Sequence, residues 1–166
     1  MGAEISKWIA FVLGAMILQT TIVPMIGVLG VRPDLVILAL FFLSVRFGML
    51  TGIWAGFAIG LMQDVYAPSQ MLGQASLAGT IIGGFFGFFN DRTMRIDAPM
   101  KALIILSGIL AHDIIFHGVQ LMRLGQNLSS LPITLITRSL PSAIYSVALS
   151  AAIYFYVNAI RPNLRR

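Results

Sequence analysis

The sequence predicts an all-α integral membrane protein built as a bundle of six transmembrane helices. Of its 166 residues, 58% are hydrophobic and only 10% are charged, and the mean hydropathy is +0.90. The apolar residues lie in long runs, close to the ~20 residues that a helix needs to cross a bilayer. A soluble domain of this size could not bury so much apolar surface, because its outer shell has to be largely polar.

The six expected spans form a single domain and follow one another closely, so neighbouring spans are expected to form tight antiparallel hairpins. Their approximate ranges are 8–29, 33–47, 48–66, 72–89, 100–121 and 132–160. The first is interpreted as a span and not as a cleaved signal peptide, because its apolar run is long and lacks a clear A-x-A site. Only the second is clearly shorter than a bilayer requires.

The second and last spans carry the clearest local signals. Arg32, Pro33 and Asp34 open the second span. Pro33 suits a first helical turn, and Asp34 can accept hydrogen bonds from the free amides there. In the last span, Pro141 removes a backbone hydrogen bond and is expected to bend the helix, with Arg138 close to the bend.

The lysines and arginines predict the orientation, because cytoplasmic connections of membrane proteins are enriched in them. With six spans both termini lie on one side, and that side holds eight of the 11 basic residues. These eight are Lys7, Arg46, Arg92, Arg95, Lys101, Arg161, Arg165 and Arg166. We therefore expect cytoplasmic termini, with the net charge of +5 facing anionic membrane lipid.

Two apolar segments share one skeleton, with glycine at every fourth residue and an acid at the end: GIWAGFAIGLMQD at 52–64 and GTIIGGFFGFFND at 79–91. Residues four apart lie nearly above one another on a helix, so each glycine ladder forms a shallow groove. In lipid, such grooves let backbones approach closely and pack by dispersion. The grooves are expected to pack spans within the chain; a docking groove for a helix of another protein is the alternative. The ladder residues are Gly52, Gly56, Gly60, Gly79, Gly83 and Gly87.

Ionisable side chains inside the spans are the other candidate functional groups, because such groups are costly in a membrane. Asp64 ends the third span on the outer side, where it is either solvated or facing a cavity. In the fifth span Asp113 and His117 are four apart and can pair on one face, which either joins helices or forms a ligand or proton site. The candidates for an outward-opening cavity or an interface are Arg32, Asp34, Asp64, Asp113, His117 and Arg138.

Enzyme, metal and nucleic-acid functions find no support in the sequence. It contains no G-x-S-x-G elbow, phosphate loop or H-E-x-x-H motif, and no cysteine. His112 and His117 are five apart, which is not the spacing of a helical zinc pair. The sequence offers no platform of aromatic and basic residues for nucleic acid. We therefore expect no enzyme activity, no metal and no cofactor.

Short motifs follow one another in a fixed order along the chain. Arg32-Pro33-Asp34-Leu35 opens the short span, Arg46-Phe47-Gly48 closes it, and Gly60-Leu61-Met62-Gln63-Asp64 ends the glycine-rich span. Leu72-Gly73 opens the fourth span, and Leu140-Pro141-Ser142 opens the last helix. In this order, in length and in the number of spans, the chain resembles the family of the bacterial rod shape-determining protein MreD.

The resemblance implies a non-enzymatic component of the cytoplasmic (inner) membrane that acts in cell elongation and peptidoglycan synthesis. It implies binding to MreC, a single-span protein with a periplasmic coiled coil, and a higher assembly with it. Other members of that complex would be the MreB cytoskeleton, the RodA glycan polymerase and its penicillin-binding transpeptidase. The family's bundle is also similar to the substrate-binding component of energy-coupling-factor vitamin transporters.

Two functions follow from these expectations. The first is a membrane scaffold that maintains rod shape, using its glycine ladders and outer loops as contact surfaces. The second is a substrate-binding component for uptake of a small, vitamin-type molecule, with a pocket in its polar outer half. The order of the motifs favours the scaffold, whereas the Asp113–His117 pair and Arg138 favour the transporter.

Overall fold

The computed structural model describes residues 2–27, 32–66, 72–90, 97–125 and 131–160, and the regular elements in these ranges are all helices. The all-α prediction is therefore confirmed, and each expected span has a helical counterpart. Asp91 and five of the basic residues used to predict the orientation (Arg92, Arg95, Arg161, Arg165 and Arg166) lie outside these ranges. The elements are α1 (Gly2–Thr21), α2 (Val23–Ile26), α3 (Leu35–Phe47), α4 (Met49–Tyr66), α5 (Gln74–Phe88), α6 (Ala98–Arg123), α7 (Leu131–Thr134), the π-helical η2 (Leu135–Ser139) and α8 (Leu140–Ile160).

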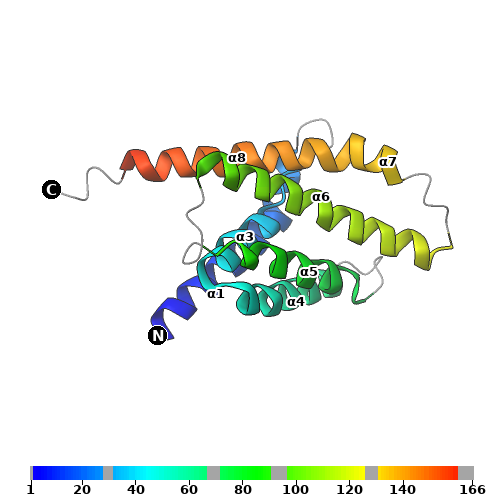
Figure 1. The fold of residues 1–166 in the computed structure, drawn as a ribbon, viewed down its shortest axis with the longest axis horizontal. Helices are drawn as coiled ribbons and strands as arrows, with labels where there is room; N and C mark the ends of the chain where they lie inside the picture. The colour runs from blue at the N-terminus through cyan, green and yellow to red at the C-terminus, as the bar shows by residue number, and fades with distance from the viewer. Residues whose placement is uncertain (1, 28–31, 67–71, 91–96, 126–130, 161–166) are drawn as a thin grey trace.

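The helices form two neighbouring groups, which lie one above the other in Figure 1. In one group α4 and α5 lie side by side and run in opposite directions, α3 packs against both, and α1 packs against α3. In the other group α6 and α8 run in opposite directions. The beginning of α1 and the end of α8 lie at the same end of the molecule, as an even number of antiparallel passes requires.

The shortest of the apolar helices, α3, lies at the centre of the bundle. It contacts α1, α4, α5, α6 and α8, and its residues 36–45 are buried except for Phe42, which is partly exposed. A helix that is apolar on all sides suits a protein core or lipid, and here the neighbouring helices cover it. Gly48 ends α3 with φ +95°, a backbone conformation that favours glycine, and α4 begins at the next residue.

The outer surface of the bundle is apolar. Eleven large apolar side chains are between 61% and 84% exposed: Ile17, Met25, Leu50, Trp54, Val65, Leu72, Phe88, Leu103, Met122, Ile133 and Ile136. Two segments, Ser6–Met25 and Pro99–Arg123, are long and apolar enough to cross a membrane, and most of their length is not covered by the rest of the chain. The apolar helices α3, α4 and α5 are shorter.

The last helical segment is interrupted before Pro141, as the sequence predicts. Residues 135–139 form the π turn η2, in which the Leu140 amide donates to the Leu135 carbonyl five residues earlier. Pro141 has no amide hydrogen and its ring crowds the carbonyl four residues before it, so the preceding turn widens. Arg138 lies in this wide turn with its side chain exposed, and Ser139 is buried.

Candidate functional site

The two glycine ladders lie against each other where α4 crosses α5, the most extensive contact between two helices in the described chain. A Cβ added at Gly52 would collide with the Gly83 carbonyl, and a Cβ at Gly56 would collide with the Gly79 carbonyl. Gly60 meets the backbone of Ala75 in the same way. Moving four residues forward along α4 therefore corresponds to moving four residues backward along the antiparallel α5. Because the ladders cover each other, neither groove is open to a helix of another protein.

Asp64, at the end of α4, is neither solvated nor exposed to a cavity, and both readings offered by the sequence are wrong. It is 2% exposed and binds the beginning of α5. Its carboxylate accepts hydrogen bonds from the amides of Gly73 (3.0 Å), Ala75 (2.9 Å) and Ser76 (3.1 Å), and from the Ser76 hydroxyl (2.7 Å). Gly73 offers no side chain to cap α5, so Asp64 supplies the cap from the preceding helix.

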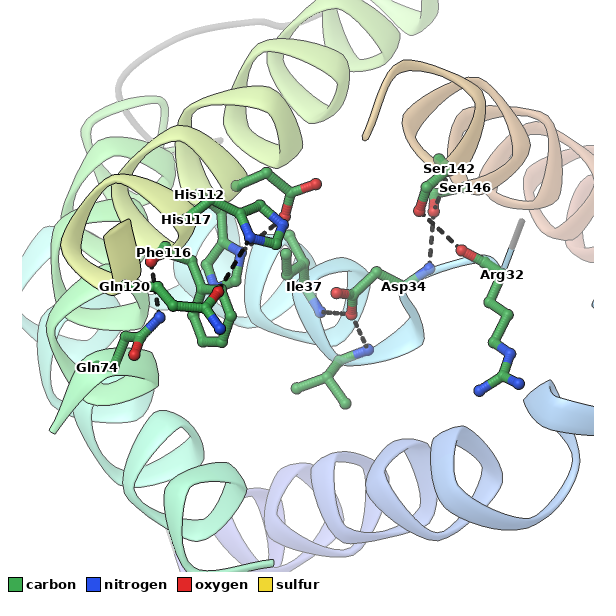
Figure 2. A network of polar contacts seen from close by, with 12 residues as sticks. Arg32, Asp34, Ile37, Gln74, His112, Phe116, His117, Gln120, Ser142 and Ser146 are labelled. Carbon is green, nitrogen blue, oxygen red and sulfur yellow. Dashed lines mark hydrogen bonds and ion pairs between the residues drawn. The ribbon is translucent and has the colours of Figure 1, made fainter. Parts of the chain in front are cut away.

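The beginning of α3 is fixed by contacts from three directions. Asp34 is the N-cap, as predicted, and its Oδ1 accepts from the amides of Val36 (3.0 Å) and Ile37 (2.9 Å). The Asp34 amide donates to the Ser146 hydroxyl of α8 at 2.8 Å, and Gln19 of α1 accepts from the Leu35 amide at 2.8 Å. Figure 2 shows the cap formed by Asp34 and its contact with Ser146.

The position expected for Pro33 is wrong by one step. Asp34 is the cap, so Pro33 precedes the helix and does not lie in its first turn. Its carbonyl oxygen accepts a hydrogen bond from the Gln19 side-chain amide at 3.3 Å, which adds a second contact with α1.

The polar residues of α6 do not pair as predicted. His112 Nδ1 lies 3.3 Å from Asp113 Oδ1, and His117 Nδ1 lies 3.3 Å from Gln120 Oε1 (Figure 2). The expected Asp113–His117 pair is therefore replaced by two separate contacts. Phe116 explains the arrangement, because its ring stacks on His112 and meets His117 edge-on.

A polar cavity of about 390 Å³ lies between α1, α3, α4, α5 and α6. Its wall combines two carboxylates, two imidazoles and two amides with a larger apolar surface. The lining residues are Met16, Gln19, Thr20, Asp34, Val36, Gln63, Ala75, His112, Asp113, Phe116 and His117. Within the described residues, no group of three histidine or acidic side chains could hold a metal ion.

Three of the six residues proposed for a cavity or interface line this one: Asp34, Asp113 and His117. Asp64 does not line it, because its carboxylate binds the amides at the beginning of α5. The side chains of Arg32 and Arg138 are exposed and do not line the cavity. Arg32 instead takes part through its backbone, because its carbonyl accepts from the Ser142 hydroxyl at 2.7 Å.

Sequence reasoning missed several residues around the cavity. Gln19 and Gln63 line it, and the buried Gln74 donates to the Phe116 carbonyl at 2.7 Å, which fixes α5 against α6. Ser139 is 1% exposed and lies beside Asp113. An amide inside an apolar span is a usable signal, because a buried amide needs partners. A single serine gives no comparable signal.

Comparison with known proteins places this architecture in a family. The family model of rod shape-determining protein MreD matches residues 3–160 of the chain. The chain belongs to the MreD family. No curated protein and no solved structure matches it.

Membership of the MreD family indicates the general function of the chain. The chain is a rod shape-determining membrane protein of a family that forms part of the MreBCD shape machinery, and this family is structural and not a known enzyme family. The expected likeness to the substrate-binding component of energy-coupling-factor transporters finds no support, since no solved structure matches. The small-molecule uptake function predicted with that likeness is unsupported as well.

Proposed function

We propose that this protein is a six-span, non-enzymatic scaffold of the bacterial cytoplasmic membrane, and that it binds MreC within the cell-elongation machinery. The observation that carries the proposal is the MreD family match over residues 3–160. In this scaffold MreB, RodA and the penicillin-binding transpeptidase are further members of the complex. The ladder glycines hold the scaffold together internally, and the partner binds on the outer surface.

The exposed apolar side chains support a partner site on that surface. On α4 the residues Leu50, Trp54, Phe57, Leu61 and Val65 are all exposed and repeat every three or four positions, on the side away from the glycines. A single-span partner can pack against such a stripe by dispersion, whereas the α4–α5 contact is already occupied. The scaffold therefore offers rigid, preformed helix faces.

The lengths of the helices support a position within a bilayer. The 26 residues of α6 extend about 39 Å, enough to cross a hydrocarbon core of ~30 Å. The 13 residues of α3 extend only about 20 Å, and α3 is enclosed by other helices. In this arrangement the short α3 leaves the polar cavity within the outer half of the membrane.

Cysteine cross-linking tests MreC binding directly, because the chain has no cysteine of its own. Single cysteines replace exposed residues of four helices, Ile17, Trp54, Leu103 and Ile144, and the buried Ile82 serves as the control position. Each variant is expressed in cells whose own copy is depleted and is oxidised against MreC carrying one cysteine in its span. We expect a disulfide from the exposed position on one of these helices and none from position 82.

The proposal requires that the same variants restore rod shape. If every variant restores rods while no exposed position cross-links to MreC, the chain supports cell shape without contacting MreC through its spans. If a wild-type copy fails to restore rods in depleted cells, the scaffold function itself is refuted.

A further inference from the structure

The cavity between α1, α3 and α6 points to a ligand chemistry, and we propose that it binds an ammonium or guanidinium group. This proposal goes beyond the scaffold function and stands on the cavity itself. Only the choice between two sources of the cation, at the end of the experiment, uses the proposed assembly.

The charge of the cavity is the first support. Asp34 and Asp113 both line it, so two carboxylates share one cavity. No lysine or arginine lines it in the part of the chain that the structure describes. Arg32 is the cation nearest in sequence, but its side chain points away from the histidines and is exposed (Figure 2). Asp113 contacts His112, whose imidazole is a cation only when protonated, so the two carboxylates have no permanently charged cationic partner among the lining residues.

Incomplete hydrogen bonding is the second support. Asp34 Oδ1 accepts from two amides, whereas its Oδ2 makes no hydrogen bond within the described residues. The Ser139 hydroxyl is 1% exposed, lies beside the Asp113 carboxylate and has no partner of good geometry in the described chain. Asp34 lines the cavity, so a carboxylate oxygen without a hydrogen bond can accept from a group that donates several hydrogen bonds. Ammonium and guanidinium groups do this.

The shape of the wall is the third support. Phe116 lines the cavity, and an aromatic face attracts an organic cation. Gln63 adds a further polar group to the wall, while Met16 and Val36 give it apolar sides suited to an alkyl stem. The volume of about 390 Å³ lies at the small end of the ~300–1,000 Å³ typical of small-molecule pockets.

Thermal unfolding of the purified full-length protein tests the binding. The probes are butylammonium and butylguanidinium chloride, with ionic strength held constant by sodium chloride. We expect the unfolding midpoint to rise with either probe and to saturate. Asp34→Asn and Asp113→Asn should each weaken the response about tenfold, because each removes one charge-assisted interaction. Asparagine caps a helix as well as aspartate does, so the first variant keeps the beginning of α3.

The control variant is Asp97→Asn, which removes an exposed carboxylate at the beginning of α6 and should leave the response unchanged. The double variant Asp34→Asn/Asp113→Asn should not respond at all, and the single variants carry the test if it does not fold. A wild-type midpoint that rises no further with the probes than with sodium chloride would overturn the proposal. An equal rise in the Asn variants would do the same.

The same titration on the native membrane assembly then distinguishes two sources of the cation. If the isolated chain responds and the assembly does not, a basic side chain of a partner protein fills the cavity. If both respond equally, the cavity takes a small organic cation. Neither result depends on whether the partner is MreC.

Discussion

Gly56→Ala tests whether direct backbone contact holds α4 against α5. A Cβ at position 56 would collide with the Gly79 carbonyl oxygen, a backbone atom that cannot turn away as a side chain can. The helices must then separate, and a gap of ~0.5–1 Å forfeits a quarter to a half of each atomic contact. For about 25 heavy-atom pairs at ~0.15 kcal/mol each, the loss is about 1–2 kcal/mol. Strain at a well-packed contact adds to this, with overpacking typically costing about 1–3 kcal/mol.

Alanine also favours a helix over glycine by about 0.5–1 kcal/mol, which opposes this loss and requires a matched control. Gly118→Ala provides it, because a Cβ at Gly118 in α6 meets nothing within 4 Å. The assay is thermal unfolding in one detergent, followed by circular dichroism. We expect Gly56→Ala to unfold at a lower temperature than wild type by a net ~1–3 kcal/mol of stability, and Gly118→Ala at the same or a higher temperature. Equal midpoints for the two variants would refute the contact.

Further changes test the polar contacts by unfolding or hydrogen exchange. Asp64→Ala leaves buried α5 amides without an acceptor and should lower the free energy of unfolding by about 2–4 kcal/mol. Asp97 is a cap without a side-chain hydrogen bond, so Asp97→Ala should change the free energy of unfolding by less than ~0.5 kcal/mol. Asp34→Ala should cost about 1 kcal/mol and Asp34→Asn much less; equal losses would mean that the charge matters and not the cap. Ser146→Ala should speed amide exchange at the beginning of α3, and an unchanged rate would show that α8 does not hold it.

The orientation is tested on the two ends of α6. Cysteine at Arg123 should react with a membrane-impermeant maleimide in intact spheroplasts. Cysteine at Lys101 should react only after the membrane is permeabilised. Labelling in the reverse order would place the termini outside.

The helices were predictable because lipid-facing and core-facing residues are both apolar, so their continuous runs indicate length directly. Glycine and proline then mark the ends: Gly48 ends α3, and Pro141 follows the π turn. The register of α4 on α5 was also present in the sequence, since two ladders with the same spacing of four can match along their length. The sequence could not show that each ladder is the partner of the other, because packing on other neighbours would use the same pattern.

The polar side chains were predicted less well, because their roles depend on partners distant in sequence. In the sequence, an acidic residue at the end of a helix gives the same pattern whether its side chain faces water or another helix. For Asp64 the informative residue lies nine positions later. Gly73 is the N-cap of α5 and has no side chain that could cap the helix. For Asp113 and His117 the helical spacing permits a pair, but Phe116 and the nearby His112 and Gln120 offer alternatives at similar distances. Side-chain rotamers decide between them, and spacing alone does not contain that information.

The shortness of α3 connects the fold with the cavity. A helix of 13 residues extends about 20 Å, so in a ~30 Å hydrocarbon core at least one of its ends would lie below the membrane surface. Asp34 is the cap at the beginning of α3, and Gln19 and Ser146 hold the chain that leads to it. Unpaired backbone groups cannot face lipid, so the neighbouring helices must bring polar side chains to this depth. The polar wall of the cavity thus follows from the length of one helix, and lengthening α3 by one turn should remove the space that a cation would occupy.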